Sequence, residues 1–278
     1  MTRRMNAPAI AALSVLIGGA VWLQQPDPVP APLRYSSEVV DGHHLLADDP
    51  AGSGRVVEAL GDLDGADDIA VLVPGTGQNR GNFRRSDGNP GTVPLANGRA
   101  LLEELRRQRP DSRAAVVVWL GYLPPQDLGP HALTSTSARE GAAELVRFDA
   151  WLPEDAHVTL VCHSYGSVVC GEAARHGGVA DDVVALGSPG MGVGGAEEVR
   201  ARVWATRADD DWIRFVPSVA LGPLGYGSDP MDPDFGARVF FPGPIHGHES
   251  YYRPGSASLE AIARIALGDG GELRETTP

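Results

Sequence analysis

The side chain with the clearest chemical context in this sequence is the hydroxyl of Ser164. It stands between a largely apolar run from His157 to Val161 and a helix-compatible stretch from Tyr165 to Arg175. Cys162 and Gly166, two residues before and after it, are small, as required where a strand turns sharply into a helix and the backbones nearly touch. The pattern predicts a nucleophile elbow, although glycine is more usual than Cys162 at the first position. A chance Ser-x-Gly turn is the alternative.

A nucleophilic serine needs a histidine base and an acid that orients the base. Three consecutive aspartates, Asp209, Asp210 and Asp211, follow an apolar run from Arg202 to Thr206. We favour Asp211 as the acid, because the apolar residues directly after it would dock its loop on the core. Asp210 is the alternative. The three carboxylates are not expected to bind a metal, since consecutive side chains rarely converge on one cation.

Two histidines compete for the role of base. His246 and His248 lie between a short strand expected from Arg238 to Phe241 and a closing helix expected from Ser256 to Leu267. We favour His248, which is closer to that helix, and keep His246 as the alternative. His163 adjoins Ser164 and is expected to point away from it, because neighbours on a strand face opposite ways.

The negative charge that develops on an attacked carbonyl needs backbone N–H donors. The apolar run from Ile69 to Val73 ends in Pro74-Gly75-Thr76-Gly77, where glycine allows the backbone to approach the site closely. We expect the amides of Thr76 and of Tyr165, the residue after the nucleophile, to form an oxyanion hole. A phosphate loop, which would need a third glycine, and a purely structural turn are the alternatives.

The elements that must position these residues alternate along the chain. An early hairpin from Ser36 to Leu46, turning at Asp41-Gly42, is followed by unbroken apolar runs and amphipathic stretches. This order predicts an α/β fold with a mostly parallel sheet and helices on both of its faces. Strands are expected at residues 69–73, 114–120, 157–162, 183–186, 202–206 and 238–241, and helices at residues 99–107, 137–151, 165–175 and 256–267.

The composition narrows the possible functions. A chain of 278 residues with 42% hydrophobic content is long enough for one sizeable domain. Its formal net charge of −13 and the lack of a basic stripe argue against nucleic acid as a partner. All 23 basic residues are arginine, which excludes lysine-based catalysis. The sequence has no short-range metal-ligand spacing and no complete nucleotide motif, so we expect neither a metal nor a cofactor.

The N-terminus has the features of an export segment. Arg3 and Arg4 precede a mostly apolar stretch from Ala7 to Leu23, which predicts a signal peptide or an uncleaved membrane anchor over residues 1–24. A buried N-terminal helix is the alternative. A proline-rich linker over residues 25–34 would lead to a domain over residues 35–270 and a tail over residues 271–278. The domain is therefore expected outside the cytoplasm, secreted or tethered to the membrane.

The two cysteines, Cys162 and Cys170, flank the predicted nucleophile. Cys170 is four residues after Gly166 on the expected helix, on the face that packs against the strand. A disulfide would suit an exported protein, and two buried thiols are an equal alternative, because the Cα separation cannot be read from the sequence.

From about Leu45 onward the chain resembles an actinobacterial family of α/β-hydrolases whose function is largely uncharacterised. The matching stretches are Asp67 to Gly77, Val116 to Tyr122 with Pro124-Pro125, Val161 to Val169, Ala185 to Gly190, Val203 to Pro217 and Phe235 to Gly268. The resemblance implies an α/β-hydrolase fold with a Ser-Asp-His site. It also implies that the base lies in a His-x-x-Tyr segment before the last helix, which corresponds to His248 and Tyr251.

Together the motifs and the resemblance predict an exported serine hydrolase acting on a small-molecule or lipid ester. Ser164 would attack the carbonyl carbon, His248 would take its proton, and Asp211 would fix the imidazole tautomer. The proline-rich loop from Pro124 to Pro130 and the segment from Val216 to Phe235 are expected to cover the site. A non-catalytic, envelope-anchored binding module on the same scaffold is the alternative, because a fold alone does not establish a function.

Overall fold

The computed structural model describes residues 29–86, 89–218, 220–221 and 224–273. The chain divides into two units, Met1–Ala31 and Pro32–Pro278, and the domain predicted from the sequence lies within the second. The export segment predicted for residues 1–24 lies outside the described residues. In the described part of the chain, no helix is long and apolar enough to cross a bilayer.

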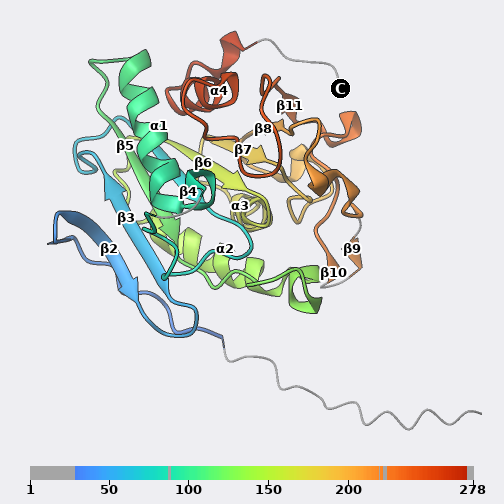
Figure 1. The fold of residues 1–278 in the computed structure, drawn as a ribbon, viewed down its shortest axis with the longest axis horizontal. Helices are drawn as coiled ribbons and strands as arrows, with labels where there is room; N and C mark the ends of the chain where they lie inside the picture. The colour runs from blue at the N-terminus through green and yellow to red at the C-terminus, as the bar shows by residue number, and fades with distance from the viewer. Residues whose placement is uncertain (1–28, 87–88, 219, 222–223, 274–278) are drawn as a thin grey trace, which may run out of the picture. The chain divides into compact units, whose positions relative to one another are not determined.

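A mixed sheet runs through the second unit (Figure 1). Within the described residues nine strands form it, in the order β1-β2-β3-β5-β4-β6-β7-β8-β11. They are β1 Glu38–Val40, β2 His43–Asp49, β3 Arg55–Leu60, β4 Asp68–Val73, β5 Ala114–Leu120, β6 His157–His163, β7 Asp182–Leu186, β8 Arg202–Thr206 and β11 Arg238–Val239. Pairing is antiparallel from β1 to β5 and parallel from β5 to β11. A separate antiparallel pair joins β9 Ala220–Leu221 to β10 Leu224–Gly225. The predicted, mostly parallel sheet is therefore confirmed.

One sheet strand, β3, was not expected from the sequence. Its burial is nearly complete, yet Arg55 and Glu58 interrupt the apolar pattern that identifies a buried strand. Glu58 is only 1% exposed and is paired with His43 and Arg84 at 2.7 and 2.9 Å. Charged residues can occupy such a strand because partners on neighbouring segments neutralise them.

Helices cover both faces of the sheet, as predicted. α1 Pro94–Gln108 and α4 Ala257–Ala266 pack on one face, and α2 Thr136–Asp149 and α3 Gly166–Ala174 pack on the other. Alternate residues of β4 point into the two cores: Ile69 and Val71 towards α2 and α3, and Ala70 and Leu72 towards α1 and α4.

The helix boundaries follow local signals. α1 begins five residues earlier than predicted, because Pro94 stands in its first turn, where the fixed φ of proline suits a helix. Ser256 caps α4 by accepting a hydrogen bond from the Leu259 amide at 3.2 Å.

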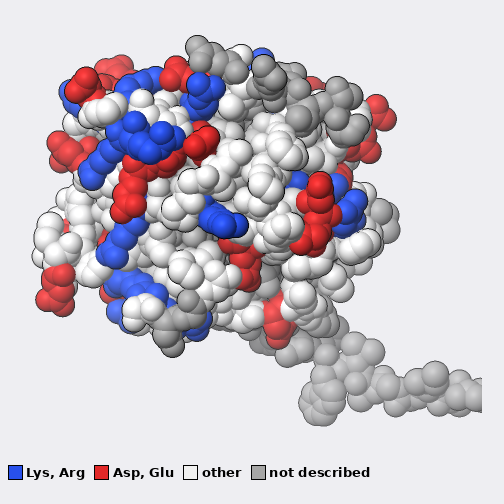
Figure 2. Space-filling model, turned by 45° about the horizontal axis from the view of Figure 1, so that its top comes forward, with Lys and Arg blue, Asp and Glu red and all other residues white. Residues whose placement is uncertain are grey.

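The carboxyl ends of the parallel strands lie at one edge of the sheet. The loops that leave this edge carry Thr76 after β4, Ser164 after β6 and Asp211 after β8. In open parallel sheets this edge is where ligands bind. On the face drawn in Figure 2, arginine and carboxylate side chains are interspersed. Several ion pairs join such side chains across the described residues, among them Arg109–Asp269 at 2.7 Å.

Candidate active site

Ser164 occupies the turn between β6 and α3 in a strained backbone conformation. Its φ of +54° lies in the left-handed region, which residues other than glycine rarely adopt. Its amide donates to the carbonyl of Leu186, at the end of β7, at 2.9 Å. A Cβ on Gly75 would lie 2.8 Å from Cβ of Ser164, and one on Gly166 would collide with the Val73 carbonyl. The two glycines therefore allow the close approach that the predicted elbow needs.

Cys162 and Cys170 form a disulfide that joins the end of β6 to α3. Their Cα atoms are 6.5 Å apart, and both side chains are fully buried. Of the two arrangements that the sequence left open, the structure contains the bridge. It spans the turn that carries Ser164, so the strand and the helix on either side of the serine are covalently linked.

Asp211 and His248 contact each other directly. Nδ1 of His248 lies 2.9 Å from each carboxylate oxygen of Asp211. The Tyr251 hydroxyl donates to Oδ2 at 2.5 Å, and the Ile213 amide donates to Oδ1 at 2.9 Å. Asp211 is fully buried, which by itself would raise the pKa of its carboxyl. The hydrogen bond and charge of His248, followed by the Tyr251 and Ile213 donors, nevertheless hold that pKa below its usual value.

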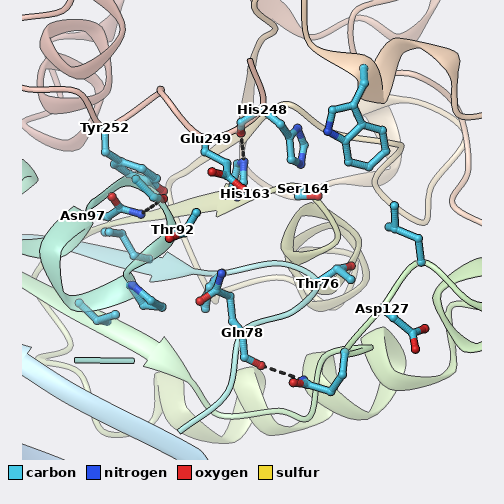
Figure 3. Close-up of a pocket in the computed structure, with 18 residues that line it drawn as sticks. Thr76, Gln78, Thr92, Asn97, Asp127, His163, Ser164, His248, Glu249 and Tyr252 are labelled. Atoms are coloured by element: carbon cyan, nitrogen blue, oxygen red, sulfur yellow. Dashed lines mark hydrogen bonds between the residues drawn. The ribbon is translucent and has the colours of Figure 1, made fainter. Parts of the chain in front are cut away.

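An ionised Asp211 fixes the tautomer of His248. Because the carboxylate accepts from Nδ1, the proton of a neutral ring is on Nδ1 and the lone pair is on Nε2. Nε2 is buried and has no hydrogen-bond partner in the described part of the chain. His248 and Ser164 line one pocket, and the His248 ring lies over Ser164 in Figure 3. The imidazole with the unpaired nitrogen and the serine thus line the same pocket.

The alternative candidates, Asp210 and His246, form a second acid–imidazole pair that is not part of the described lining of this pocket. Nδ1 of His246 lies 3.2 Å from Oδ2 of Asp210, and the amide of Gly247 donates to Oδ1 of Asp210 at 2.8 Å. Both side chains are exposed. The pair lies at the surface of the loop, and neither side chain is among the described residues that line the pocket of Ser164.

The aspartate cluster does not converge on a cation. Asp210 faces His246 and Asp211 faces His248, so the neighbouring carboxylates diverge. No group of three His, Cys, Asp or Glu side chains suited to a metal ion occurs among the residues that the structure describes.

The amides of Thr76, which lines the pocket, and of Tyr165, the residue after Ser164, have no described acceptor. Tyr165 is the N-cap of α3, where backbone N–H groups lack partners within the helix. A Cβ on Gly75 would lie 3.1 Å from the Tyr165 nitrogen, so the two loops touch beside Ser164. The unpaired amide of Tyr165 is therefore next to Ser164, and the unpaired amide of Thr76 directly follows the glycine that contacts this turn.

The pocket above Ser164 has a volume of about 250 Å³. Its floor is apolar, with Leu72 from β4 and Val118 from β5, and Trp212 contributes to its wall. A neighbouring groove of about 520 Å³ shares His248 and Trp212 with it. The remaining lining residues of the first pocket are Pro74, Thr76, Gln78, Gly91, Thr92, Pro94, Asn97, Gln126, Asp127, Leu128, His163, Glu249 and Tyr252. The loop from Pro124 to Pro130 thus covers the site as expected, whereas the segment from Val216 to Phe235 supplies none of the described lining.

Comparison with known proteins identifies the family. A family model described as alpha/beta hydrolase matches residues 49–221, which is more than half of the chain. The chain belongs to this alpha/beta hydrolase family.

Relatives of the hydrolase include uncharacterized mycobacterial proteins. It is 30% identical over 267 residues to Rv2079 of Mycobacterium tuberculosis, a match covering 83% of this chain and 40% of that relative, so the chain spans less than half of its length. It is 35% identical over 185 residues to Rv0963c of the same species, covering 61% and 67% of the two chains. The solved thioesterase domain from the curacin biosynthetic pathway matches with a TM-score of 0.46 at 9% identity, covering 85% and 100%. The predicted membership of an actinobacterial α/β-hydrolase family is confirmed.

The expectation for His163 was wrong. Its ring lies beside that of His248, with centroids 4.6 Å apart, and its Nε2 donates to the His248 carbonyl at 2.6 Å. Strand alternation fails because β6 ends at His163 and the left-handed backbone of Ser164 turns both side chains towards the pocket of the hydrolase. Burial, followed by the charge of His248, lowers the pKa of His163 to about 3. The ring is therefore neutral and holds the backbone of His248 in place.

Proposed function

We propose that this chain is a serine hydrolase that cleaves carboxylic esters through an acyl-enzyme intermediate. Ser164 is the nucleophile, His248 the general base and Asp211 the acid that orients the base. The observation that supports these roles is the state of the His248 ring. Its Nδ1 is hydrogen-bonded to Asp211, its buried Nε2 has no described partner, and the residue lines the same pocket as Ser164. A ring held in this way has one basic nitrogen free to take a proton.

The reaction runs in two halves. In the first, Ser164 Oγ bonds to the ester carbonyl carbon while His248 Nε2 takes the hydroxyl proton, and the amides of Thr76 and Tyr165 stabilise the oxyanion. When the carbonyl re-forms, the bond to the alkoxy oxygen breaks, and His248 returns the proton to that oxygen. In the second half, water loses a proton to His248 and attacks the acyl carbonyl carbon. The bond from that carbon to Ser164 Oγ then breaks, His248 returns the proton to Oγ, and the carboxylic acid leaves. An ester is favoured over an amide, because an alcohol leaves with less assistance than an amine.

A fluorophosphonate probe and a short p-nitrophenyl ester test this function. The wild-type chain should be labelled at Ser164 and should release p-nitrophenol, whereas Ser164→Ala should do neither while keeping its thermal midpoint. Ser86→Ala, which changes an exposed serine away from the pocket, is the matched control and should keep both activities. A folded wild-type protein that is neither labelled nor active would instead favour the non-catalytic binding module.

We also propose that the hydrolase acts outside the cytoplasm, secreted or tethered to the membrane by its N-terminal segment. Arg3 and Arg4 before the apolar stretch support export, and the Cys162–Cys170 disulfide suits an oxidising compartment. A version that starts at Pro32 should be soluble and active, because all described strands follow that residue. Fractionation of cells expressing the full chain is the test, and an uncleaved protein found wholly in the cytosol would contradict the proposal.

A further inference from the structure

The side-chain amide of Gln78 is an unpaired polar group in the wall of the pocket that contains Ser164. Its Oε1 is buried and has no hydrogen-bond partner, and its Nε2 makes no hydrogen bond to any described residue either. Figure 3 shows this side chain pointing from the loop after β4 into the pocket. Buried amide oxygens are normally paired, so an unpaired one on a residue that lines a pocket indicates a ligand that donates to it.

Three other polar side chains of the same pocket already donate hydrogen bonds to backbone carbonyls. Nδ2 of Asn97 donates to the Gly91 carbonyl at 3.0 Å, and the Thr92 hydroxyl donates to the Asn89 carbonyl at 2.7 Å. Nε2 of Gln126 donates to the backbone carbonyls of Gln78 and Pro124, each at 2.9 Å. Gln78 therefore differs from the other side-chain amides of the pocket, Asn97 and Gln126, each of which makes at least one hydrogen bond.

The loop that carries Gln78 is held rigidly. The Gly77 amide donates to the Pro125 carbonyl at 2.8 Å, and Nδ2 of Asn82 donates to the Gly77 carbonyl at 2.8 Å. With the Gln126 contact to its own carbonyl, the backbone of Gln78 is fixed on both sides. A group held in this way can select a ligand without the cost of being ordered on binding.

The geometry of the proposed reaction decides which part of an ester meets Gln78. The leaving oxygen must lie near Nε2 of His248 to receive its proton. The neighbouring groove is lined by His248 but, among the described residues, not by Ser164 or Gln78, so it suits the alcohol portion. Gln78 lines only the pocket with Ser164 and Thr76, which leaves that pocket for the acyl portion.

We propose that Gln78 is a specificity-determining residue that selects short acyl groups bearing a hydrogen-bond donor, a hydroxyl or an amide N–H. The inference rests on the proposed function and deepens it. The pocket volume of about 250 Å³ is small for a ligand site, which limits the length of the acyl chain. Asp127 and Glu249 line the pocket, and no arginine is among its described lining residues, so acyl groups that carry a carboxylate are disfavoured.

Relative kcat/KM values for three p-nitrophenyl esters test the proposal. Butyrate has no donor, 3-hydroxybutyrate has a hydroxyl, and 3-acetamidopropanoate has an amide N–H. The selectivity for a donor ester over butyrate should fall about 10-fold or more from the wild type to Gln78→Met, which keeps the bulk and removes the amide. Comparing this ratio between proteins cancels the intrinsic reactivities of the esters. The donor ester that shows the fall identifies whether the hydroxyl or the amide is recognised.

Two further variants sharpen the result. Gln78→Glu keeps an acceptor oxygen and should retain most of the selectivity; if it loses as much as Gln78→Met, the acceptor role is overturned. Asn97→Leu changes another side-chain amide of this pocket, which is paired with the Gly91 carbonyl and makes no hydrogen bond to Gln78 among the described residues, and should affect donor and plain esters alike.

The outcomes separate this proposal from the function on which it rests. Equal selectivity in the wild type and Gln78→Met, with all esters cleaved, would overturn the role of Gln78 and leave the serine hydrolase intact. Failure of the wild type to cleave any ester or to react with a fluorophosphonate would overturn both.

Discussion

A Cβ atom on Gly187 would lie 2.7 Å from Oδ2 of Asp211. It would also lie 2.9 Å from the Tyr251 hydroxyl and 3.1 Å from Nδ1 of His248. Gly187 directly follows β7 with a φ of +51°, and its amide donates to the Thr206 carbonyl at 3.1 Å. Its missing side chain therefore leaves the space in which the acid, the imidazole and the tyrosine meet.

Gly187→Ala should reduce kcat/KM by about 10-fold or more, because the new methyl group displaces the Asp211 carboxylate from Nδ1 of His248. Gly178→Ala is the matched control, since Gly178 also has a positive φ of +82° but nothing lies within 4 Å of its Cβ position. The control should show only the backbone strain, about 1–2 kcal/mol of stability, with normal activity. If the two variants lose activity equally, the contact with Asp211 is unimportant.

His248→Ala should lower kcat by about 10³-fold or more, whereas His246→Ala should change it little. The difference follows from position: His248 lines the pocket with Ser164, while His246 is exposed and paired with Asp210. Ester turnover by both purified variants is the measurement. An inactive His246→Ala beside an active His248→Ala would reverse the assignment and leave the reaction class unchanged.

The corresponding contrast is expected for the acids. Asp211→Asn should lower kcat by about 10³–10⁴-fold, because an amide can stabilise the wrong imidazole tautomer and cannot balance the imidazolium charge. Asp210→Asn should have a small effect, since its carboxylate contacts only the surface loop at His246 and Gly247. Matching thermal midpoints would show that the loss in Asp211→Asn is catalytic, and full turnover by that variant is the outcome that contradicts the assignment.

The sequence predicts most of the fold because its strands are signalled locally. The strands expected at residues 114–120 and 202–206 have those same bounds in the structure, since each is an unbroken run between polar ends. The sequence argument for Asp211 was that the two apolar residues after it dock its loop on the core, and this holds for one of them. Ile213 is buried and docks the loop, as expected, but Trp212 is 41% exposed and packs against the ring of His248 with centroids 4.9 Å apart.

The residues that sequence reasoning missed act through tertiary contacts. Gly187 matters only because β8 brings Asp211 against it, and Gln78 is distinctive only because neighbouring amides are paired and its own is not. Neither relation leaves a local pattern. The position of His163 next to Ser164 is a local sign that it lies near the site. Its orientation could be predicted only by knowing that the left-handed backbone of Ser164 ends strand alternation.

His163 should make the fold less stable in mild acid. Its pKa is about 3 in the folded protein and about 6.5 when unfolded, so between these values the unfolded chain binds a proton that the folded chain does not. The free energy of unfolding therefore falls as the pH drops below about 6.5. His163→Gln removes this titration and can still donate to the His248 carbonyl, so its thermal midpoint should fall less between pH 7 and pH 5.

The groups around His163 keep this comparison interpretable. The rings of His248 and Tyr251 face it, and the depressed pKa of Asp211 affects stability only below about pH 4, outside the range compared. All three are present in both proteins, so the difference between the two slopes reports on His163. Parallel slopes would show that His163 is protonated in the folded state as readily as in the unfolded one.

Removing the disulfide should lower the thermal midpoint without abolishing activity. A bridge between residues eight apart in sequence stabilises by about 2–3 kcal/mol in the chain-entropy account, which corresponds to a fall of about 5–10 °C for a domain of this size. The Cys162→Ala/Cys170→Ala variant should show this fall and, unlike the wild type, no further change with reductant. Its kcat/KM at 25 °C should stay within about threefold of the wild type, because the contacts of Gly75 and Gly166 and the hydrogen bond from Ser164 to Leu186 hold the turn independently. A variant that is as stable as the wild type but inactive would instead assign the bridge to positioning the serine.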